Sequence, residues 1–285
     1  MTTTRSLTRS PYEYSSYRDG REEASSTRLT PASNRYTAEP PSGRLSADPS
    51  WRRKLLQSLS EMEQMLEGFA KHLQAGHVAP APSGRNDFSL RAGVKPTDIW
   101  GGFYQTVNGN CVTVSAIKAS MMKFGSSPLG IYKSIARTAD GYTVTMRDSY
   151  VAKITDAELA SAARNSHFAG KNDEMLKDAN FLYAVSAKRA QEENNEGRAR
   201  ESFEVAMATL NNGEYPGDAF RRLGLIAYVR HATMQELADG ALGTLAYDRH
   251  SVAVIDGHEE RFGVKGDPPP LERRLVAEYQ AIKLV

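Results

Sequence analysis

Cysteine is almost absent from this 285-residue chain, which has one, at position 111. A single thiol cannot form an internal disulfide, so the sequence excludes a fold held together by disulfides. It also excludes any zinc site built from two or more cysteines. The histidines are scattered without the spacing of metal ligands, so we expect no metal site.

Long apolar runs and a strong net charge are also missing. No run of about 18 apolar residues occurs, so we expect no membrane span. The first residues, MTTTRSLTRSPYEYSS, lack the apolar region of a secretory signal peptide. The net charge of +2 is too small to favour nucleic acid or an anionic membrane as a partner. The sequence contains no P-loop, GxGxxG or GxSxG motif, and we expect no cofactor.

Residues 1–50 contain no valine, isoleucine or phenylalanine and are rich in Ser, Thr, Arg and Pro. Such a segment cannot bury enough apolar surface to offset its chain entropy, so we predict that it is disordered. Two interpretations remain open. The segment is either a flexible tail or an export signal, because its composition resembles the leaders of bacterial effectors delivered by type III secretion.

Residues 51–77 are predicted to form one amphipathic helix. Their apolar residues recur at spacings of three and four, which gives a single apolar stripe. This helix either packs on the main domain or docks a partner such as a secretion chaperone. Pro80 and Pro82 begin a stretch that we interpret as a linker over residues 78–97.

Residues 98–285 have the pattern of a folded domain. Helical patterns precede strand patterns along the chain, which favours the α+β class. A predicted hairpin consists of HSVAVID at 250–256, a GHEE turn, and RFGVKG at 261–266. The other predicted elements are a strand at Tyr142–Met146 and helices at Asn110–Phe124, Thr155–Ala163, Asn180–Glu193, Glu201–Leu210, Ala219–Leu223 and Thr233–Leu242.

Cys111 lies at the predicted start of a helix. Unpaired amides and the positive dipole end at a helix N-terminus stabilise a thiolate, which is the reactive form of cysteine. A lone cysteine is also commonly a small buried core residue. His250 begins a predicted strand 139 positions later, and histidine has the pKa range of a base near neutral pH.

The segment GGFYQTVNGNCVTVSAIKA, with Gln105 six residues before Cys111, resembles the nucleophile motif of the papain and calpain clan. HSVAVID resembles the strand that carries the base histidine in that clan. The resemblance covers roughly residues 98–270. It departs from the clan at Val112, where tryptophan is usual, and at Asp267-Pro268-Pro269, where Asn-Pro-Trp is usual.

The resemblance implies a papain-like fold, in which a helical subdomain carries the cysteine and an antiparallel β subdomain carries the histidine and an acidic partner. Cys111 is then the nucleophile, His250 the base, and Gln105 a donor to the oxyanion. We expect Asp267 to orient His250, because it ends the strand predicted to pair with the His250 strand. Asp256 is the alternative, but it lies six residues along the same strand, about 20 Å away.

The predicted function is that of a cysteine peptidase that hydrolyses a protein substrate through a thioester. The favoured setting is a secreted bacterial effector that acts in the cytoplasm of a host cell, and the alternative is the cytoplasm of the producing bacterium. Two other functions remain open. One is a glutamine deamidase or transglutaminase that uses the same triad, and the other is a binding effector without catalysis.

Overall fold

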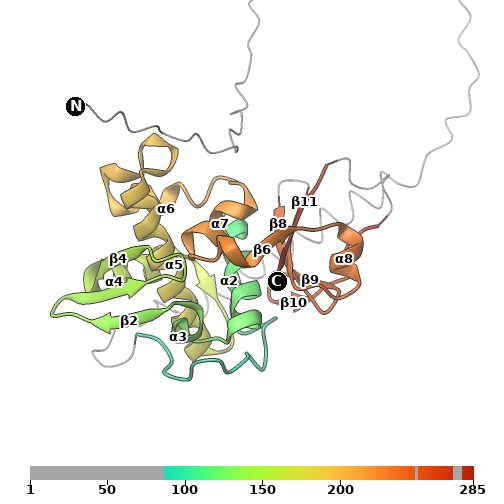
Figure 1. Cartoon of the computed structure of the whole chain (residues 1–285), viewed down its shortest axis with the longest axis horizontal. Helices are drawn as coiled ribbons and strands as arrows, with labels where there is room; N and C mark the ends of the chain where they lie inside the picture. Colours follow the sequence, from blue (N-terminus) through green and yellow to red (C-terminus); the bar gives the residue numbers. More distant parts are fainter. Residues whose placement is uncertain (1–86, 248–249, 272–277) are drawn as a thin grey trace, which may run out of the picture. The chain divides into compact units, whose positions relative to one another are not determined.

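The computed structural model describes residues 87–247, 250–271 and 278–285. The expected leader at 1–50 and the expected helix at 51–77 lie outside these residues. The described residues belong to the α+β class, with antiparallel sheets (Figure 1), as the order of sequence patterns predicted. Within the described part of the chain, no helix combines the length and the apolar character needed to cross a membrane.

Most strands belong to two antiparallel sheets. One sheet has six strands in the order β10-β9-β8-β7-β11-β6, and the other has three in the order β2-β3-β4. The bounds in the larger sheet are β6 Val229–His231, β7 Gly243–Tyr247, β8 His250–Ile255, β9 His258–Arg261, β10 Val264–Lys265 and β11 Gln280–Leu284. The bounds in the smaller sheet are β2 Ser134–Arg137, β3 Gly141–Thr145 and β4 Val151–Thr155. The short strands β1 Tyr104–Gln105 and β5 Phe168–Ala169 pair with each other.

The helices begin and end at the signals that the sequence carries. Thr155 and Glu158 form a complete capping box that begins α4, and Gly125 ends α2 at a φ of 98°. The helices are α2 Cys111–Phe124, α3 Pro128–Ile131, α4 Asp156–Asn165, α5 Asp173–Glu193, α6 Phe203–Ala208, α7 Pro216–Arg222 and α8 Met234–Ala238. Each predicted helix from residue 110 onward therefore has a counterpart, with α5 longer and α8 shorter than expected.

Helix α2 is the central element of the described domain. Every side chain from Cys111 to Met121 is buried, so the helix is covered on all sides. It packs against β8 and β7 of the six-stranded sheet and against α5 and α7 on its other side. Figure 1 shows α2 between α5 and the six-stranded sheet.

Strand β8 is covered on both faces of the sheet. Ala253 and Ile255 belong to the main hydrophobic core, while Val252 and Val254 belong to a second core with residues of α8 and β11. Because successive side chains of a strand leave on opposite faces, β8 is fully enclosed. This explains why its sequence is almost continuously apolar.

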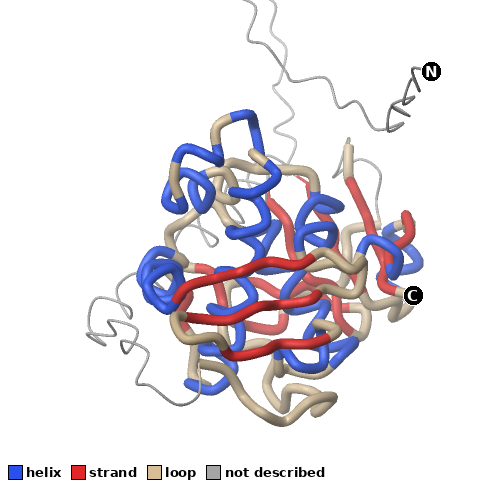
Figure 2. Tube along the Cα trace, turned by 60° about the vertical axis from the view of Figure 1, so that its left-hand side comes forward, coloured by secondary structure: helices blue, strands red, loops and turns tan. Residues whose placement is uncertain are grey.

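The three-stranded sheet packs on α4 and α5 and lies at the front in Figure 2. Phe88 joins this part of the core, with its ring 4.6 Å from that of Phe181 and 5.6 Å from that of Tyr142. The side chain is buried, at 7% exposure. Phe88 therefore belongs to the packed core, although it lies in the stretch interpreted as a linker before the expected domain start at residue 98.

The predicted hairpin from residue 250 to residue 266 is folded differently from expectation. Asp256 and Gly257 form a two-residue turn with φ of 50° and 75°, so the chain returns as β9 at His258 rather than at Arg261. Phe262 and Gly263 form a second such turn, with φ of 47° and 91°. The expected single return strand is therefore two strands, and β10 pairs on the far side of β9.

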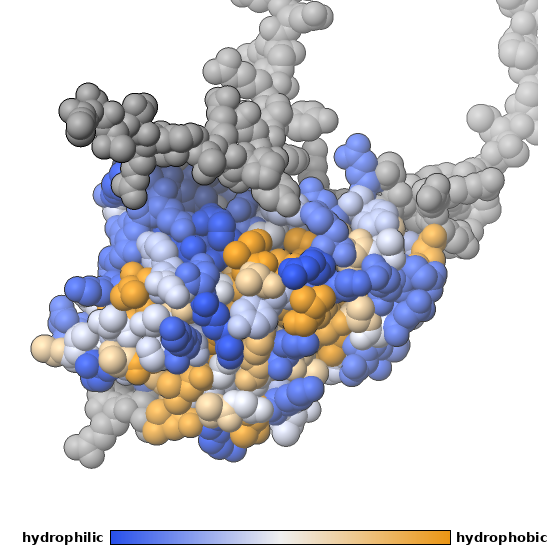
Figure 3. Space-filling model, in the orientation of Figure 1, coloured by the Kyte–Doolittle hydropathy of each residue, from blue (hydrophilic) through white to orange (hydrophobic). Residues whose placement is uncertain are grey.

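The exposed apolar side chains do not form one continuous surface on the face shown in Figure 3. Orange, hydrophobic side chains lie there in separate patches between blue, hydrophilic ones. Scattered exposed apolar residues are normal on a folded domain. The large exposed apolar residues among the described residues include Val107, Val151, Ile226, Val264 and Val285.

A buried carboxylate attaches the start of the described chain to α5. Asp178 accepts hydrogen bonds from the Ser89 backbone N–H at 2.6 Å and from the Ser89 hydroxyl at 2.9 Å. Burial raises the pKa of Asp178 to about 7, and the two hydrogen bonds only partly oppose this effect. Ionised Asp178 is therefore less favourable in the folded chain than in the unfolded one.

We expect the free energy of unfolding to fall as the pH rises from about 4 to 7, by up to about 3 kcal/mol from this group. The native state holds the Asp178 proton over this range, whereas the unfolded chain has released it. Asp178→Asn should remove this part of the slope in urea unfolding measured at several pH values. Asp239→Asn, at an exposed carboxylate, is the matched control and should keep the slope. An unchanged slope in Asp178→Asn would show that this carboxyl is not buried as described.

Candidate functional site

Cys111 is the first residue of α2, where the helix has no side-chain cap. Asn110, at the N-cap position, makes no capping hydrogen bond. Its side-chain amide instead donates to the carbonyl of Ser166 at 2.8 Å. The first-turn amides of α2 are therefore not occupied by the side chain that usually accepts from them.

The loop before Cys111 is fixed by contacts with β1, with the end of α4 and with the segment that follows α6. The Gln105 side-chain amide donates to the Asn108 carbonyl, and the Asn108 side chain donates to Asn165 at 2.9 Å. Gly109 forms a bridge with Asn212, and a Cβ at Gly109 would lie 2.4 Å from the Asn211 carbonyl oxygen. Gln105 thus contacts the loop that leads into Cys111, and one of its two amide hydrogens remains for another acceptor.

The start of α2 is docked on β8 beside His250. The Ser251 backbone N–H lies close enough to the Cys111 sulfur to lower the pKa of the thiol. One helical turn later, the Ser115 and Ser251 hydroxyls share a buried hydrogen bond of 2.9 Å. The structure therefore brings together the helix start and the strand that were predicted to carry the nucleophile and the base.

His250 is the first residue of β8 and pairs with Tyr247 across the ladder. Its ring stacks on that of Phe262, with 5.2 Å between centroids and 16° between planes. Among the described residues, no hydrogen bond joins the imidazole to the Cys111 thiol. His250 precedes Ser251 in β8, and successive side chains of a strand leave on opposite faces, so the direct contact with the thiol that the resemblance implied is not made.

Both groups are neutral at pH 7 in this arrangement. Burial raises the pKa of the Cys111 thiol, and the Glu214 carboxylate raises it further. The Ser251 N–H offsets only part of the effect of burial. Burial lowers the pKa of His250 to about 4, and the Arg261 guanidinium adds to the shift. The site therefore holds a thiol and a neutral imidazole rather than an ion pair.

Asp267 is not brought to His250, contrary to the expectation that it orients the ring. The Asp267 carbonyl accepts from the Glu259 N–H at 3.0 Å, and Glu259 pairs with Val254 of β8. Val254 lies four residues from His250, so Asp267 is about 13 Å further along the sheet and about 10 Å across it. The second turn, at Phe262–Gly263, causes this displacement because it moves the chain to the far side of β9.

Asp256 is also remote from the imidazole. It occupies the tight turn at the far end of β8 from His250, and its carbonyl accepts from the His258 ring at 2.9 Å. The separation along β8 that disfavoured this residue from the sequence is thus present in the structure. Neither acidic candidate for the third position contacts His250 among the described residues.

Two buried ion pairs beside α2 were not expected from the sequence. Lys118 of α2 pairs with Glu260 at 3.2 Å, with side-chain exposures of 0% and 7%. Arg222 of α7 pairs with Glu214, whose charge acts on Cys111. The only signal for the first pair was a lysine within an otherwise apolar or small-residue helix. The second pair had no signal, because its partners lie in separate segments with unremarkable composition.

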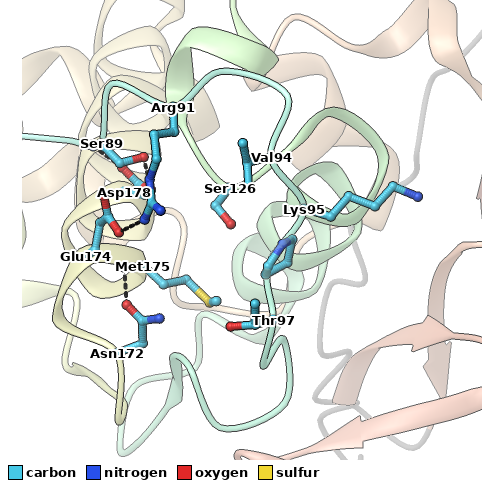
Figure 4. Close-up of a pocket in the computed structure, with 11 residues that line it drawn as sticks. Ser89, Arg91, Val94, Lys95, Thr97, Ser126, Asn172, Glu174, Met175 and Asp178 are labelled. Atoms are coloured by element: carbon cyan, nitrogen blue, oxygen red, sulfur yellow. Dashed lines mark hydrogen bonds and ion pairs between the residues drawn. The ribbon is translucent and has the colours of Figure 1, made fainter.

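A surface hollow of about 80 Å³ lies at the other end of α2 (Figure 4). Its lining includes Ser126, which follows the end of the helix, and Asp178 of α5. The 14-residue helix places this hollow about 20 Å from Cys111. Figure 4 shows the Arg91–Glu174 ion pair at one side and Lys95 extending away. The hollow is therefore separate from the candidate site.

The described residues also contain no group of three or more His, Cys, Asp or Glu side chains that could hold a metal ion. The chemistry available at the start of α2 is that of a thiol, an imidazole, an amide side chain and uncapped backbone donors. This set suits nucleophilic acyl transfer, in which the sulfur attacks a carbonyl and the donors receive the oxyanion.

We expect iodoacetamide to modify Cys111 slowly at pH 7, with a rate that rises about tenfold per pH unit up to pH 9. The thiol pKa lies above its ordinary value, so the reactive thiolate is scarce at neutral pH. Since the chain has one cysteine, the mass of the intact protein reports this reaction alone. A rate that levels off below pH 7 would instead indicate a thiolate stabilised by imidazolium.

In Asp267→Asn, the rate at which substrate-like electrophiles modify Cys111 should stay within about twofold of the rate in the unchanged protein. Asp267 is exposed and remote from His250, so its substitution should not alter the reactivity of the thiol. His250→Gln is the comparison variant and should slow the same reaction strongly. A large loss of labelling in Asp267→Asn, without a loss of folding, would restore this residue to the site.

Comparison with known proteins gives no match for this chain. No protein-family model matches it, and neither a curated protein nor a solved structure does so. The functional interpretation therefore depends on the residues and contacts described above. These place a single buried thiol at an uncapped helix start, against the strand that His250 begins.

Proposed function

We propose that this chain is a cysteine peptidase with a papain-like arrangement, in which Cys111 is the nucleophile and His250 is the base. The observation that carries the proposal is the buried 2.9 Å hydrogen bond between Ser115 and Ser251, which docks the start of α2 on β8, where the Ser251 backbone N–H also lowers the pKa of the Cys111 thiol. Because Ser251 follows His250 directly, this contact places the thiol beside the backbone of the candidate base, although the two lie 139 positions apart.

The start of α2 supports a role in acyl transfer. The Cys111 backbone N–H is at the first position of the helix, where no intrahelical acceptor exists. Gln105, the last residue of β1, is proposed as a second donor, because its side-chain amide already bonds to the loop that leads to the same point. Two donors at the place where negative charge develops are the usual means of stabilising a tetrahedral oxyanion.

The reaction proceeds in two steps with His250 carrying one proton. In the first, the Cys111 thiol proton passes to the imidazole while sulfur bonds to the peptide carbonyl carbon. The C–N bond then breaks, and the leaving amine takes that proton from His250. In the second, water attacks the thioester carbon and gives a proton to His250. The C–S bond breaks, which releases a carboxylic acid and returns the proton to the sulfur.

The neutral state of both groups favours a base-assisted attack over a preformed ion pair. The imidazole, with a pKa of about 4, is free to accept a proton throughout the neutral range. The thiol must then lose its proton during the attack itself. Catalytic hydrogen bonds are often loose without substrate and tighten in the complex, so we expect substrate binding to bring the sulfur and the ring into contact.

The proposal assigns a Cys–His pair and no carboxylate as third member. The substrate we propose is a protein, and the proposed setting is the host-cell cytoplasm reached by a bacterial effector. That setting is supported only by the composition of residues 1–50. The peptide-bond reaction is tested separately from the setting, because it needs only the purified chain.

We expect a biotinylated, mixed-sequence peptidyl vinyl sulfone to label Cys111 of the full chain, and His250→Gln to reduce the labelling rate by about 100-fold or more. Loss of the base removes the acceptor for the thiol proton during attack. Labelling is measured by mass spectrometry of the intact protein. Cys111→Ala should abolish it and should abolish cleavage of a denatured protein mixture without lowering the melting temperature greatly.

His258→Gln is the matched control, because this histidine begins β9 at the opposite end of β8 from His250, and its ring hydrogen-bonds to the Asp256 carbonyl. It should label at the unchanged rate. Equal labelling of the unchanged chain and His250→Gln would exclude His250 as base. Mass gains of about one dalton in substrate proteins, without new peptide ends, would identify a glutamine deamidase instead.

A further inference from the structure

We propose that the buried Lys118–Glu260 pair is a positioning device that fixes the candidate base and the candidate oxyanion donor relative to each other. This inference rests on the proposed function of Cys111 and His250. Lys118 lies in the middle of α2, and Glu260 lies in β9 of the six-stranded sheet. The pair therefore joins the helix that carries the nucleophile to the sheet that carries the base.

Lys118 has a full set of partners inside the core. Its ammonium donates to the carbonyls of Ile99 and Trp100, each at 2.8 Å, and lies 3.2 Å from a Glu260 carboxylate oxygen. It also lies 5.0 Å from the centre of the Phe103 ring. An ammonium has three hydrogens, so two carbonyls and one carboxylate use all of them.

Glu260 uses the same carboxylate oxygen to hold the turn that follows it. The Gly263 amide donates to this oxygen at 2.6 Å. Gly263, with a φ of 91°, adopts its conformation without strain, whereas Phe262, with a φ of 47°, is in a conformation that is costly for a bulky side chain and needs outside support. The fixed carboxylate supplies that support, and Lys118 fixes the carboxylate.

The turn contacts the candidate base and the residue that precedes the candidate oxyanion donor. On one side, the Phe262 ring stacks on the His250 imidazole. On the other side, Gly263 lies against the Tyr104 ring, because a Cβ at Gly263 would lie 2.6 Å from a carbon of that ring. Tyr104 precedes Gln105 in β1. The Phe262–Gly263 turn therefore packs between His250 and β1, the strand that carries Gln105.

The backbone that Lys118 binds leads to the same strand. Ile99 and Trp100 precede Phe103, Tyr104 and Gln105 in one continuous segment. Lys118 therefore holds this segment directly, through two carbonyls, and holds the opposing turn indirectly, through Glu260. Neither Lys118 nor Glu260 needs to touch the substrate for a change in their positions to misplace the reacting groups.

The test compares Lys118→Met with the double variant Lys118→Met/Glu260→Met in the full chain. The single variant leaves a buried carboxylate without its cation, so it should be strongly destabilised. The double variant removes both charges and keeps side chains of similar length, so its melting temperature should recover. The Ile99, Trp100 and Gly263 backbone groups, however, still lack their partners.

The deciding measurement in the double variant is the position of the His250 ring. In histidine-labelled protein, the imidazole protons of His250, assigned from the His250→Gln spectrum, should lie upfield because of the stacked Phe262 ring. This displacement should be lost in the double variant. With the peptidyl vinyl sulfone, the maximal inactivation rate should fall about 10- to 100-fold, while the probe concentration for half-maximal rate changes less than about threefold.

The other buried pair beside α2 supplies the matched control. The double variant Glu214→Met/Arg222→Met removes an equally buried ion pair that involves α7, which packs on α2 and α5. It should keep the upfield His250 signals. If a folded Lys118→Met/Glu260→Met chain retains both the His250 signals and the unchanged inactivation rate, the pair is only structural and the inference is wrong. If the unchanged chain is never labelled at Cys111, the proposed function fails, while the His250 signals still decide the placement of the ring.

Discussion

The hydrogen bond between the Ser115 and Ser251 hydroxyls joins the central helix to the central strand of the larger sheet at a buried point. Two small polar side chains allow the helix to lie close to the strand. The Ser115 hydroxyl also donates to the Val112 carbonyl at 3.0 Å, and the buried Ser251 hydroxyl would lose this partner if Ser115 were removed. Because Cys111 lies one turn before Ser115 and His250 directly precedes Ser251, this contact fixes the start of the helix against the backbone at the start of β8. The main and the second hydrophobic core both include residues of this strand.

The sequence predicted the helices well because their limits depend on local signals. The capping box at Thr155 and Glu158 and the glycine after Phe124 act within a few residues, and the structure has both. The hairpin after His250 was misplaced although its signal was present. Asp256-Gly257 is a preferred pair for a two-residue turn, but the interpretation placed the turn over GHEE. The second turn, at Phe262–Gly263, then placed the expected acidic partner one strand further from β8 than predicted.

The charges inside the domain could not have been predicted from local patterns. A lysine in a helix ordinarily indicates a solvent-facing position, and only the separate positions of Ile99, Trp100 and Glu260 in space make Lys118 a core residue. The neutral state of the Cys111 thiol likewise depends on tertiary structure. A helix start favours a thiolate, but burial at this start outweighs the backbone donors, and burial depends on the tertiary structure.

Strand β11 lies between β7 and β6, so it supplies hydrogen bonds to both. Strand β6 has no other neighbour in the sheet, although it precedes β11 by about 50 residues in the chain. Its pairing must therefore wait until a long loop has closed, whereas the two tight turns between β8 and β10 close over only two residues each. The sheet thus combines a rapidly formed, local half with a half of high contact order, and the second half is expected to limit the rate at which the domain folds.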